Sequence, residues 1–304
     1  QAVVVGNEVA GGATGGGRVS SIPKSFLGAL PHEVGHALGG LGDEYDMSAG
    51  NDPKRRIIKA RAGNLSARPR PPNLAEGSLR AEVLDVVPWR YWIEAGKEAW
   101  WNRGLVEVFE GGGASPVEVW RPQANCMMRY GGWFCVVCME AMVRAIYRQV
   151  RPIDAASPVE SEIRHPAATA LVLEAAVLKP RTHYLEVRWD LEYVPPAPGP
   201  REQPLPGAGA TTGVPAALAA QGPVPRKVHG EGYRRIAPGG RVVEGLRVAG
   251  DQMRDPGTYR FSIQVSDPTP WVLRDEEGLL RQSRTWTVIV EGKVPPGRPR
   301  PAGG

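Results

Sequence analysis

The chain has 304 residues, of which 42 % are hydrophobic, enough to bury a substantial core in roughly two domains. No apolar run reaches the roughly 18 residues that cross a bilayer, so the sequence predicts no membrane span. The net charge is +5, but the basic residues are spread along the chain. Their densest stretch, residues 54 to 70, is broken by proline and glycine and has no interleaved aromatic residues, which argues for a solvated loop and against a nucleic-acid partner.

The chain opens with a β-branched run and a glycine-rich turn. Residues 3 to 5 are valines and predict a short strand, and residues 11 to 17 are mostly glycine. No Gly-Lys-Ser/Thr follows the glycines, so they do not match a phosphate-binding loop. The first residue is Gln1 and no secretion signal is recognisable, so we expect a processed or truncated N-terminus.

Two histidines in the next segment have the spacing of a metal site. His32 and His36 are four residues apart, so a helix places both imidazoles on one face. Glu33 occupies the general-base position of H-E-x-x-H enzymes, where a carboxylate reaches a metal-bound water without being a ligand. The chain has only 5 histidines, so chance is a poor explanation of this pair. Pro31 must lie in the first turn of the helix or kink it.

A glycine run predicts the end of this helix. Residues 39 to 42 read Gly-Gly-Leu-Gly, and glycine is the usual residue just past a helix C-terminus. The chain can then double back and bring Asp43 and Glu44 towards the histidines. A catalytic zinc takes three protein ligands and keeps one position for water. We predict Asp43 as the third ligand, with Glu44 as the weaker alternative.

The block from His32 to Tyr45, H-E-V-G-H-A-L-G-G-L-G-D-E-Y, resembles the active-site signature of the IgA-peptidase family of zinc metallopeptidases, which is metzincin-like. Ordinary metzincins place the third ligand six residues after the second histidine, which is Gly42 here. The resembled family, like this chain, has an acidic residue one position later, at Asp43. The resemblance implies a secreted peptidase with a protein or peptide substrate, without identifying that substrate as immunoglobulin A. It also implies that the chain begins inside the catalytic domain.

Aromatic residues are concentrated further along the chain. Residues 86 to 93 read V-V-P-W-R-Y-W-I, and Trp100 and Trp101 follow. Such clusters more often form a core or the wall of a cleft than a ligand-binding box. The P-W-x-x-W-I pattern and the F-E-G-G-G at residues 109 to 113 also resemble the catalytic domain of the family.

The block N-C-M-M-R-Y at residues 125 to 130 is the next informative one. Metzincin-like enzymes carry a methionine-containing turn beneath the zinc, and some have a tyrosine two residues later that reaches the metal site. The resemblance thus makes Met128 the methionine of this turn and Tyr130 a candidate catalytic residue. The alternatives are a core methionine and a surface tyrosine.

The chain contains 3 cysteines, Cys126, Cys135 and Cys138. A structural zinc needs four ligands, and no histidine lies nearby in the sequence to complete the set. Thioredoxin-type chemistry would need a neighbouring βαβ pattern, which is absent. We therefore expect one disulfide that joins Cys126 to Cys135 or Cys138 and leaves one thiol over. An amphipathic helix should follow, with this apolar stripe: Cys138, Ala141, Met142, Ala145, Ile146.

The pattern of apolar and charged residues changes after Pro152. Apolar and charged residues alternate through residues 185 to 191, which predicts a half-buried strand, with residues 171 to 177 as its hairpin partner. Further strands are expected at residues 241 to 248, 259 to 265 and 286 to 290. Residues 194 to 228 are rich in proline, glycine and alanine and predict a long loop or disordered insertion.

The sequence as a whole predicts an α+β chain of two domains. Residues 1 to 152 would form a zincin-like or metzincin-like catalytic domain, and residues 153 to 292 an antiparallel, immunoglobulin-like β-sandwich that acts as a scaffold. A disordered tail is expected at residues 293 to 304. The segment D-P-T-P-W-V at residues 267 to 272 resembles one in the same family.

Two functions compete for this sequence. The first is a zinc endopeptidase in which Zn²⁺ is held by His32, His36 and Asp43, with Glu33 as the general base and Tyr130 as a further catalytic candidate. The second is a secreted binding or adhesion protein with a degenerate zinc domain, in which the β-domain would carry the function. Glu33 argues against the second, because a purely structural site has no use for that carboxylate.

Overall fold

A computed structural model describes residues 2–6, 19–46, 70–96, 104–196 and 226–291. It has the predicted α+β character, with mostly antiparallel sheets and few helices. The chain divides into two compact units. Unit 1 comprises Gln1–Val150 and Thr269–Leu279, and unit 2 comprises Arg151–Pro268 and Leu280–Gly304. The segment Thr269–Leu279 therefore belongs to unit 1, whereas the sequence assigned it to the β-domain.

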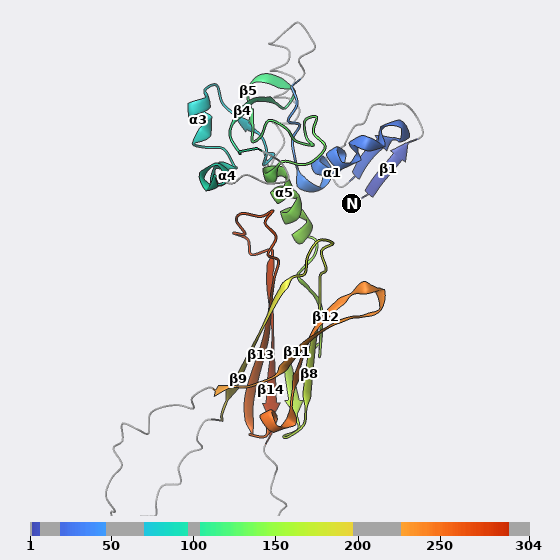
Figure 1. Cartoon of the computed structure of the whole chain (residues 1–304), viewed down its shortest axis with the longest axis vertical. Coiled ribbons are helices and arrows are strands. Elements are labelled where there is room, and N and C mark those ends of the chain that lie inside the picture. Colours follow the sequence, from blue (N-terminus) through green and yellow to red (C-terminus); the bar gives the residue numbers. More distant parts are fainter. Residues whose placement is uncertain (1, 7–18, 47–69, 97–103, 197–225, 292–304) are drawn as a thin grey trace, which may run out of the picture. The chain divides into compact units, whose positions relative to one another are not determined.

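Unit 1 begins with a parallel strand pair that leads into the histidine helix (Figure 1). The pair is β1 (Ala2–Gly6) and β2 (Val19–Pro23), followed by η1 (Lys24–Ala29) and α1 (Leu30–Gly39). Pro31 lies in the first turn of α1, where its missing N–H costs nothing, so the helix starts there. Gly40 follows with φ +61°, a left-handed conformation that glycine adopts without strain. The predicted glycine stop is confirmed.

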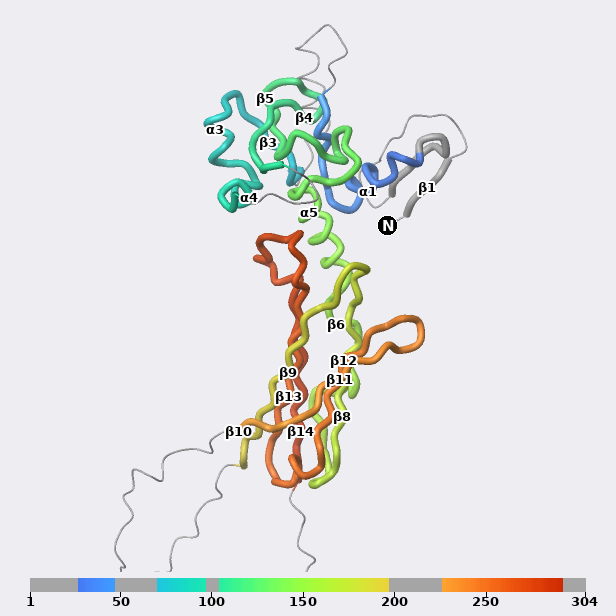
Figure 2. The backbone as a smooth tube through the Cα atoms, viewed as in Figure 1, coloured from blue at the N-terminus to red at the C-terminus, as the bar shows by residue number. Residues whose placement is uncertain are grey.

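Among the residues that the structure describes, the remainder of unit 1 combines one small sheet with the helices α3, α4 and α5 (Figure 2). The antiparallel sheet has the order β3-β5-β4, with β3 (Ala75–Glu76), β4 (Phe109–Gly112) and β5 (Ser115–Arg121). The helices are α3 (Arg80–Leu84), α4 (Arg90–Ala95) and α5 (Val136–Tyr147). Within the described residues, no helix combines the length and apolar character that a membrane crossing requires.

The aromatic segment around α4 forms part of the core of unit 1, as predicted. Trp89 and Trp92 are buried, and the indole N–H of Trp89 donates to the Glu107 carbonyl over 2.9 Å. The indole of Trp92 donates to the buried carboxylate of Glu140 on α5. Each buried N–H thus has the partner that burial demands. Trp100 and Trp101 lie outside the described residues.

Helix α5 packs on a wider face than the predicted stripe. Cys138, Met142 and Ala145 are buried as expected, but Ile146 is 44 % exposed and that part of the prediction is wrong. Val143 and Tyr147 are buried as well. The helix is covered over most of its circumference, and Ile146 falls on the remaining solvent side.

Unit 2 consists of two sheets that share one hydrophobic core. The five-stranded sheet has the order β10-β9-β13-β14-β7, and β14 pairs with β7 in parallel. The four-stranded sheet has the order β11-β12-β8-β6 and is antiparallel throughout. The elements are β6 (Ile153–Ser157), β7 (Glu162–His165), β8 (Leu171–Val177), β9 (Glu186–Val194), β10 (Arg226–Lys227), β11 (Glu231–Ile236), η3 (Pro238–Gly240), β12 (Val242–Val248), η4 (Gly250–Met253), β13 (Gly257–Ser266) and β14 (Arg281–Val290).

The period-two patterns identified the strands but not all of their partners. Tyr259, Phe261 and Ile263 on β13 are fully buried, as their alternation predicts. The predicted hairpin between residues 171–177 and 185–191 is wrong, because β8 pairs with β6 and β12 while β9 pairs with β13 and β10. The alternation of apolar and polar residues indicates which face of a strand is buried, but not which strands it pairs with. Strands β8 and β9 belong to different sheets, and each buries its apolar face in the shared core.

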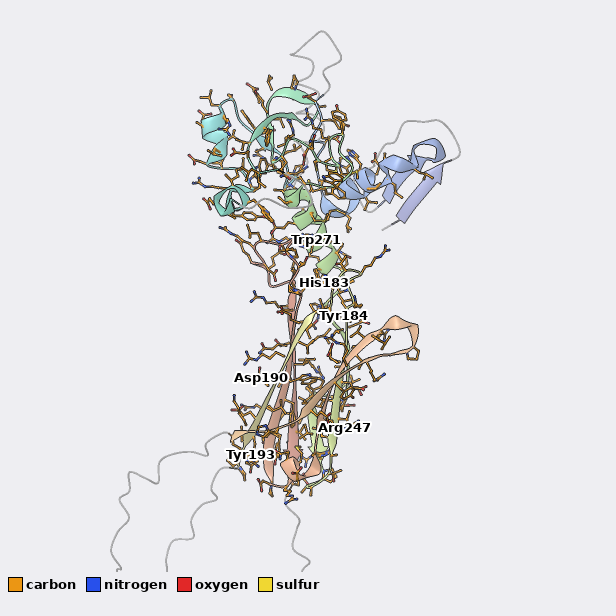
Figure 3. All side chains as sticks on the ribbon, viewed as in Figure 1. His183, Tyr184, Asp190, Tyr193, Arg247 and Trp271 are labelled. Atoms are coloured by element: carbon orange, nitrogen blue, oxygen red, sulfur yellow. The ribbon has the colours of Figure 1, made fainter. Side chains whose placement is uncertain are left out.

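The proline-rich insertion is shorter than predicted among the described residues. Strand β9 continues to Val194, and Val228, predicted to lie in the loop, is buried in the core. Tyr193 lies on β9 (Figure 3). Its hydroxyl donates to the Pro256 carbonyl over 2.9 Å, and the Arg226 guanidinium lies over its ring. The rest of the predicted insertion, the predicted basic loop, the first glycine-rich run and the predicted tail lie outside the described residues, at residues 197–225, 47–69, 7–18 and 292–304.

Candidate metal centre

Helix α1 and the turn after it bring three ligand atoms to one point. The Nε2 atoms of His32 and His36 are 3.1 Å apart, and the Oδ1 atom of Asp43 lies 3.1 Å from each of them. A tetrahedral zinc with bonds of about 2.0–2.1 Å holds its nitrogen and oxygen ligands about 3.3 Å apart. The triangle therefore has the size of three zinc ligands.

Backbone carbonyls at both Nδ1 atoms favour the neutral tautomer in which Nε2 can bind a metal. Nδ1 of His32 lies 3.0 Å from the Met127 carbonyl, and Nδ1 of His36 lies 2.6 Å from the Leu41 carbonyl. A carbonyl oxygen only accepts, so each neutral ring carries its hydrogen on Nδ1 and a lone pair on Nε2. Backbone partners of this kind orient metal-binding histidines. In the neutral rings, two nitrogen lone pairs and a carboxylate then converge on one point, which suits a cation, so the residues fit zinc.

Protons compete with a metal for these histidines. Burial by itself lowers the pKa of His32 and of His36, but the hydrogen bond and charge of Asp43, together with the backbone carbonyls, outweigh it, and both pKa values are raised. Because zinc binds the neutral imidazole, the zinc affinity of the centre depends on the fraction of His32 and of His36 that is deprotonated.

We expect the zinc affinity of this centre to fall as the pH is lowered, with the loss beginning above 6.5, the ordinary pKa of histidine. Competition with a chromophoric chelator at a series of pH values measures this. His183 provides the control, because it also contacts an aspartate, Asp267, over 2.7 Å, but lies in unit 2. His183→Ala should leave the profile unchanged, and an affinity that does not vary with pH would contradict the assignment of His32 and His36 as ligands.

Glu33 lies beside the ligand triangle without being part of it. Its side chain is buried on α1, at 8 % exposure, and its charge acts on His32 and on Tyr45. A carboxylate in this position is close to the metal-binding atoms and shielded from bulk water.

Two tyrosines extend the site outward from His32. The ring of Tyr45 stacks on that of His32 at 6.2 Å and on that of Tyr130 at 6.1 Å. Burial, followed by the charge of Asp43 and a hydrogen bond with it, raises the pKa of Tyr45, so its hydroxyl stays protonated and donates to Asp43. Tyr130 is 73 % exposed, and its hydroxyl donates to the Asp46 carbonyl over 3.2 Å. Sequence reasoning singled out Tyr130 and missed Tyr45, the last residue of the signature block.

Met128 packs directly against helix α1 beside the histidines. It is fully buried, and a Cβ atom added at Gly35 would lie only 2.7 Å from its sulfur. Gly35 lies immediately before His36, so the absence of a side chain there lets Met128 approach the backbone of helix α1.

A buried asparagine holds the turn that presents Asp43. The Asn73 side chain accepts from the Gly42 N–H over 2.8 Å and donates to the Gly42 carbonyl over 2.9 Å. A Cβ at Gly42 would lie 2.4 Å from the Leu74 side chain, so a side chain at position 42 would force Leu74 to shift, whereas the carboxylate of Asp43 lies beside the histidines. Nothing in the local sequence around Asn73 indicates this role.

Glu44, the alternative third ligand, does not join the histidines. Its side chain is fully buried, and its Oε1 atom accepts from Asn73 over 3.0 Å and lies 3.1 Å from the sulfur of Cys138. Cys126, Cys135 and Cys138 are all free, so the expected disulfide is wrong. The three thiols gather instead around this carboxylate, which comes from a distant part of the chain.

A scan of the chain against protein-family models found no match, and a search among curated proteins found no similar one.

Proposed function

We propose that the chain is a zinc-dependent endopeptidase that acts on proteins or peptides. The observation that carries this proposal is the triangle formed by the Nε2 atoms of His32 and His36 and the Oδ1 atom of Asp43, with a backbone carbonyl at each Nδ1 atom. Three protein ligands leave one tetrahedral position open, which is the pattern of catalytic rather than structural zinc.

Zinc bound at this centre would supply Lewis acidity, which acidifies a water molecule and polarises a substrate carbonyl. Glu33 accepts the proton of the attacking water on its carboxylate and then delivers it to the nitrogen of the departing amine. Tyr45 holds its proton and orients the Asp43 carboxylate. Tyr130, exposed at the end of the aromatic stack, is placed to contact the substrate.

The proposal also covers the folds of the two units. Helix α1, the turn after Gly40 and the packing of Met128 on Gly35 support a metzincin-like catalytic unit. Two sheets on a common core support an immunoglobulin-like β-sandwich as its scaffold. Action outside the cell follows from the sequence resemblance.

Hydrolysis of an unstructured protein such as casein by the purified full chain tests this function. We expect cleavage that 1,10-phenanthroline abolishes and added zinc restores. The alternative, a binding or adhesion protein with a degenerate zinc domain, requires a chain that keeps its zinc but cleaves neither casein nor any member of a peptide library. That outcome would overturn the proposal.

A further inference from the structure

Unit 1 contains a second group of metal-binding side chains, separate from the histidines. Cys126, Cys135, Cys138 and Glu44 each offer one ligand atom, and these four atoms lie within 4.8 Å of one another. All four residues have 0 % exposure. We propose that they bind a structural zinc ion through three thiolates and one carboxylate. This inference does not depend on the proposed peptidase activity.

The distances around the carboxylate suit a zinc ion. Oε1 of Glu44 lies 3.1 Å from the sulfur of Cys138 and 3.7 Å from that of Cys135. With bonds of about 2.3 Å to sulfur and about 2.1 Å to oxygen, a tetrahedral zinc holds such ligands about 3.6 Å apart. The observed separations lie on either side of this value.

The described residues compensate the buried Glu44 carboxylate only in part. Asn73 donates to Oε1 of Glu44, whereas Oε2 has no hydrogen-bond partner among the residues that the structure describes. The guanidinium of Arg121 acts on Glu44 through its charge, but its hydrogen bonds go to the carbonyls of Glu110 and Gly111. A buried carboxylate is costly unless a cation balances it, and a zinc ion among the thiolates would do so.

Backbone N–H groups donate to two of the three sulfurs. The N–H groups of Met128 and Cys135 donate to the sulfur of Cys126 over 3.4 and 3.2 Å. The sulfur of Cys135 caps helix α5 and accepts from the Cys138 N–H over 3.5 Å. Burial alone would raise the pKa of the Cys126 thiol, but hydrogen bonds from the two neighbouring thiols and from these backbone groups lower that pKa. Burial raises the pKa values of the Cys135 and Cys138 thiols, so a bound cation is needed to hold all three as thiolates.

A disulfide explains this arrangement less well than a metal. It would join two of the three sulfurs and leave the third thiol and the Glu44 carboxylate buried together without a shared partner. One cation satisfies all four groups. Thiolate ligands select zinc over magnesium or calcium, and four protein ligands without solvent access are the pattern of a structural site.

Metal analysis of the full chain, expressed with zinc and purified under reducing conditions, tests the proposal. We expect about two zinc ions per chain in the wild type and about one in the His32→Ala/His36→Ala double variant. The zinc left in the double variant should show zinc–sulfur distances of about 2.3 Å by X-ray absorption. Its cobalt-substituted form should show sulfur-to-cobalt charge-transfer absorption, and Cys126→Ser should abolish that absorption.

A buried serine could unfold unit 1, so Glu44→Gln serves as a second variant of nearly equal size. We expect it to weaken retention of the thiolate-bound metal while the histidine-bound metal remains. The proposal is overturned if the histidine double variant loses all zinc, or if alkylation and mass analysis find a disulfide among the three cysteines of the zinc-loaded protein. A chain that shows the sulfur-to-cobalt charge-transfer absorption but cleaves no substrate would contradict the proposed peptidase activity and still support the thiolate zinc site.

Discussion

Replacement of Glu33 by glutamine should leave the zinc in place and reduce turnover by on the order of 100- to 10,000-fold on any cleaved peptide. The amide fills the same buried space beside His32 and can still hydrogen-bond a water molecule. It cannot accept the proton of that water, so binding should survive while the chemistry fails. Steady-state cleavage rates together with zinc content measure both effects.

Glu82→Gln provides the matched control, because it makes the same chemical change at an exposed position of helix α3 in the same unit. It should leave turnover and zinc content unchanged. If Glu33→Gln keeps its zinc and more than about a tenth of the wild-type activity, proton abstraction by Glu33 is not the mechanism, because so small a factor fits only a positional role.

Replacement of Asp43 by alanine should release the zinc of the histidine centre and abolish cleavage with it. Loss of a mere outer-shell partner typically costs about 10- to 100-fold in metal affinity, and loss of a direct ligand should cost at least as much. The alanine also leaves the Tyr45 hydroxyl without its acceptor, which adds to the disorder of the site.

Competition with a chelator of known affinity measures the zinc affinity of the Asp43→Ala variant. Asp46→Ala is the control, since it removes a carboxylate three residues further along that lies 3.7 Å from the Arg129 guanidinium. Its zinc affinity should match that of the wild type. Glu44 is unsuitable as the control because its carboxylate belongs to the thiol cluster. Wild-type affinity in Asp43→Ala would remove Asp43 from the ligand set.

The histidine pair could be predicted because its geometry is local. Four residues of helix separate His32 from His36, and the glycine stop at Gly40 depends on one backbone conformation, so both are encoded within a few neighbouring positions. The prediction of Asp43, one residue after Gly42, as the third ligand came from a sequence resemblance. The crowding that a side chain at position 42 would meet from Leu74 became visible only in the structure.

Several features that the sequence did not reveal depend on long-range contacts. Asn73 reaches Gly42 across 31 positions, and Glu44 meets Cys138 across 94. The cysteine spacing alone offered three metal ligands, so the missing fourth led to the wrong expectation of a disulfide. The same limit applies in unit 2, because the alternation of apolar residues indicates the buried face of β8 and of β9 but not the strands that they pair with.

The carbonyl that receives the Nδ1 proton of His32 belongs to Met127, 95 positions further along the chain. It is a main-chain atom, so no substitution at residue 127 removes it, and only a shift of the surrounding turn can alter its donor–acceptor distance. The Cys126 carbonyl accepts from Arg129 and Gly131 within that turn, and a Cβ at Gly131 would lie 3.0 Å from the Cys126 carbonyl. The basicity of the His32 imidazole can therefore be changed during evolution through the curvature of a remote turn, while His32, His36 and Asp43 themselves stay unchanged.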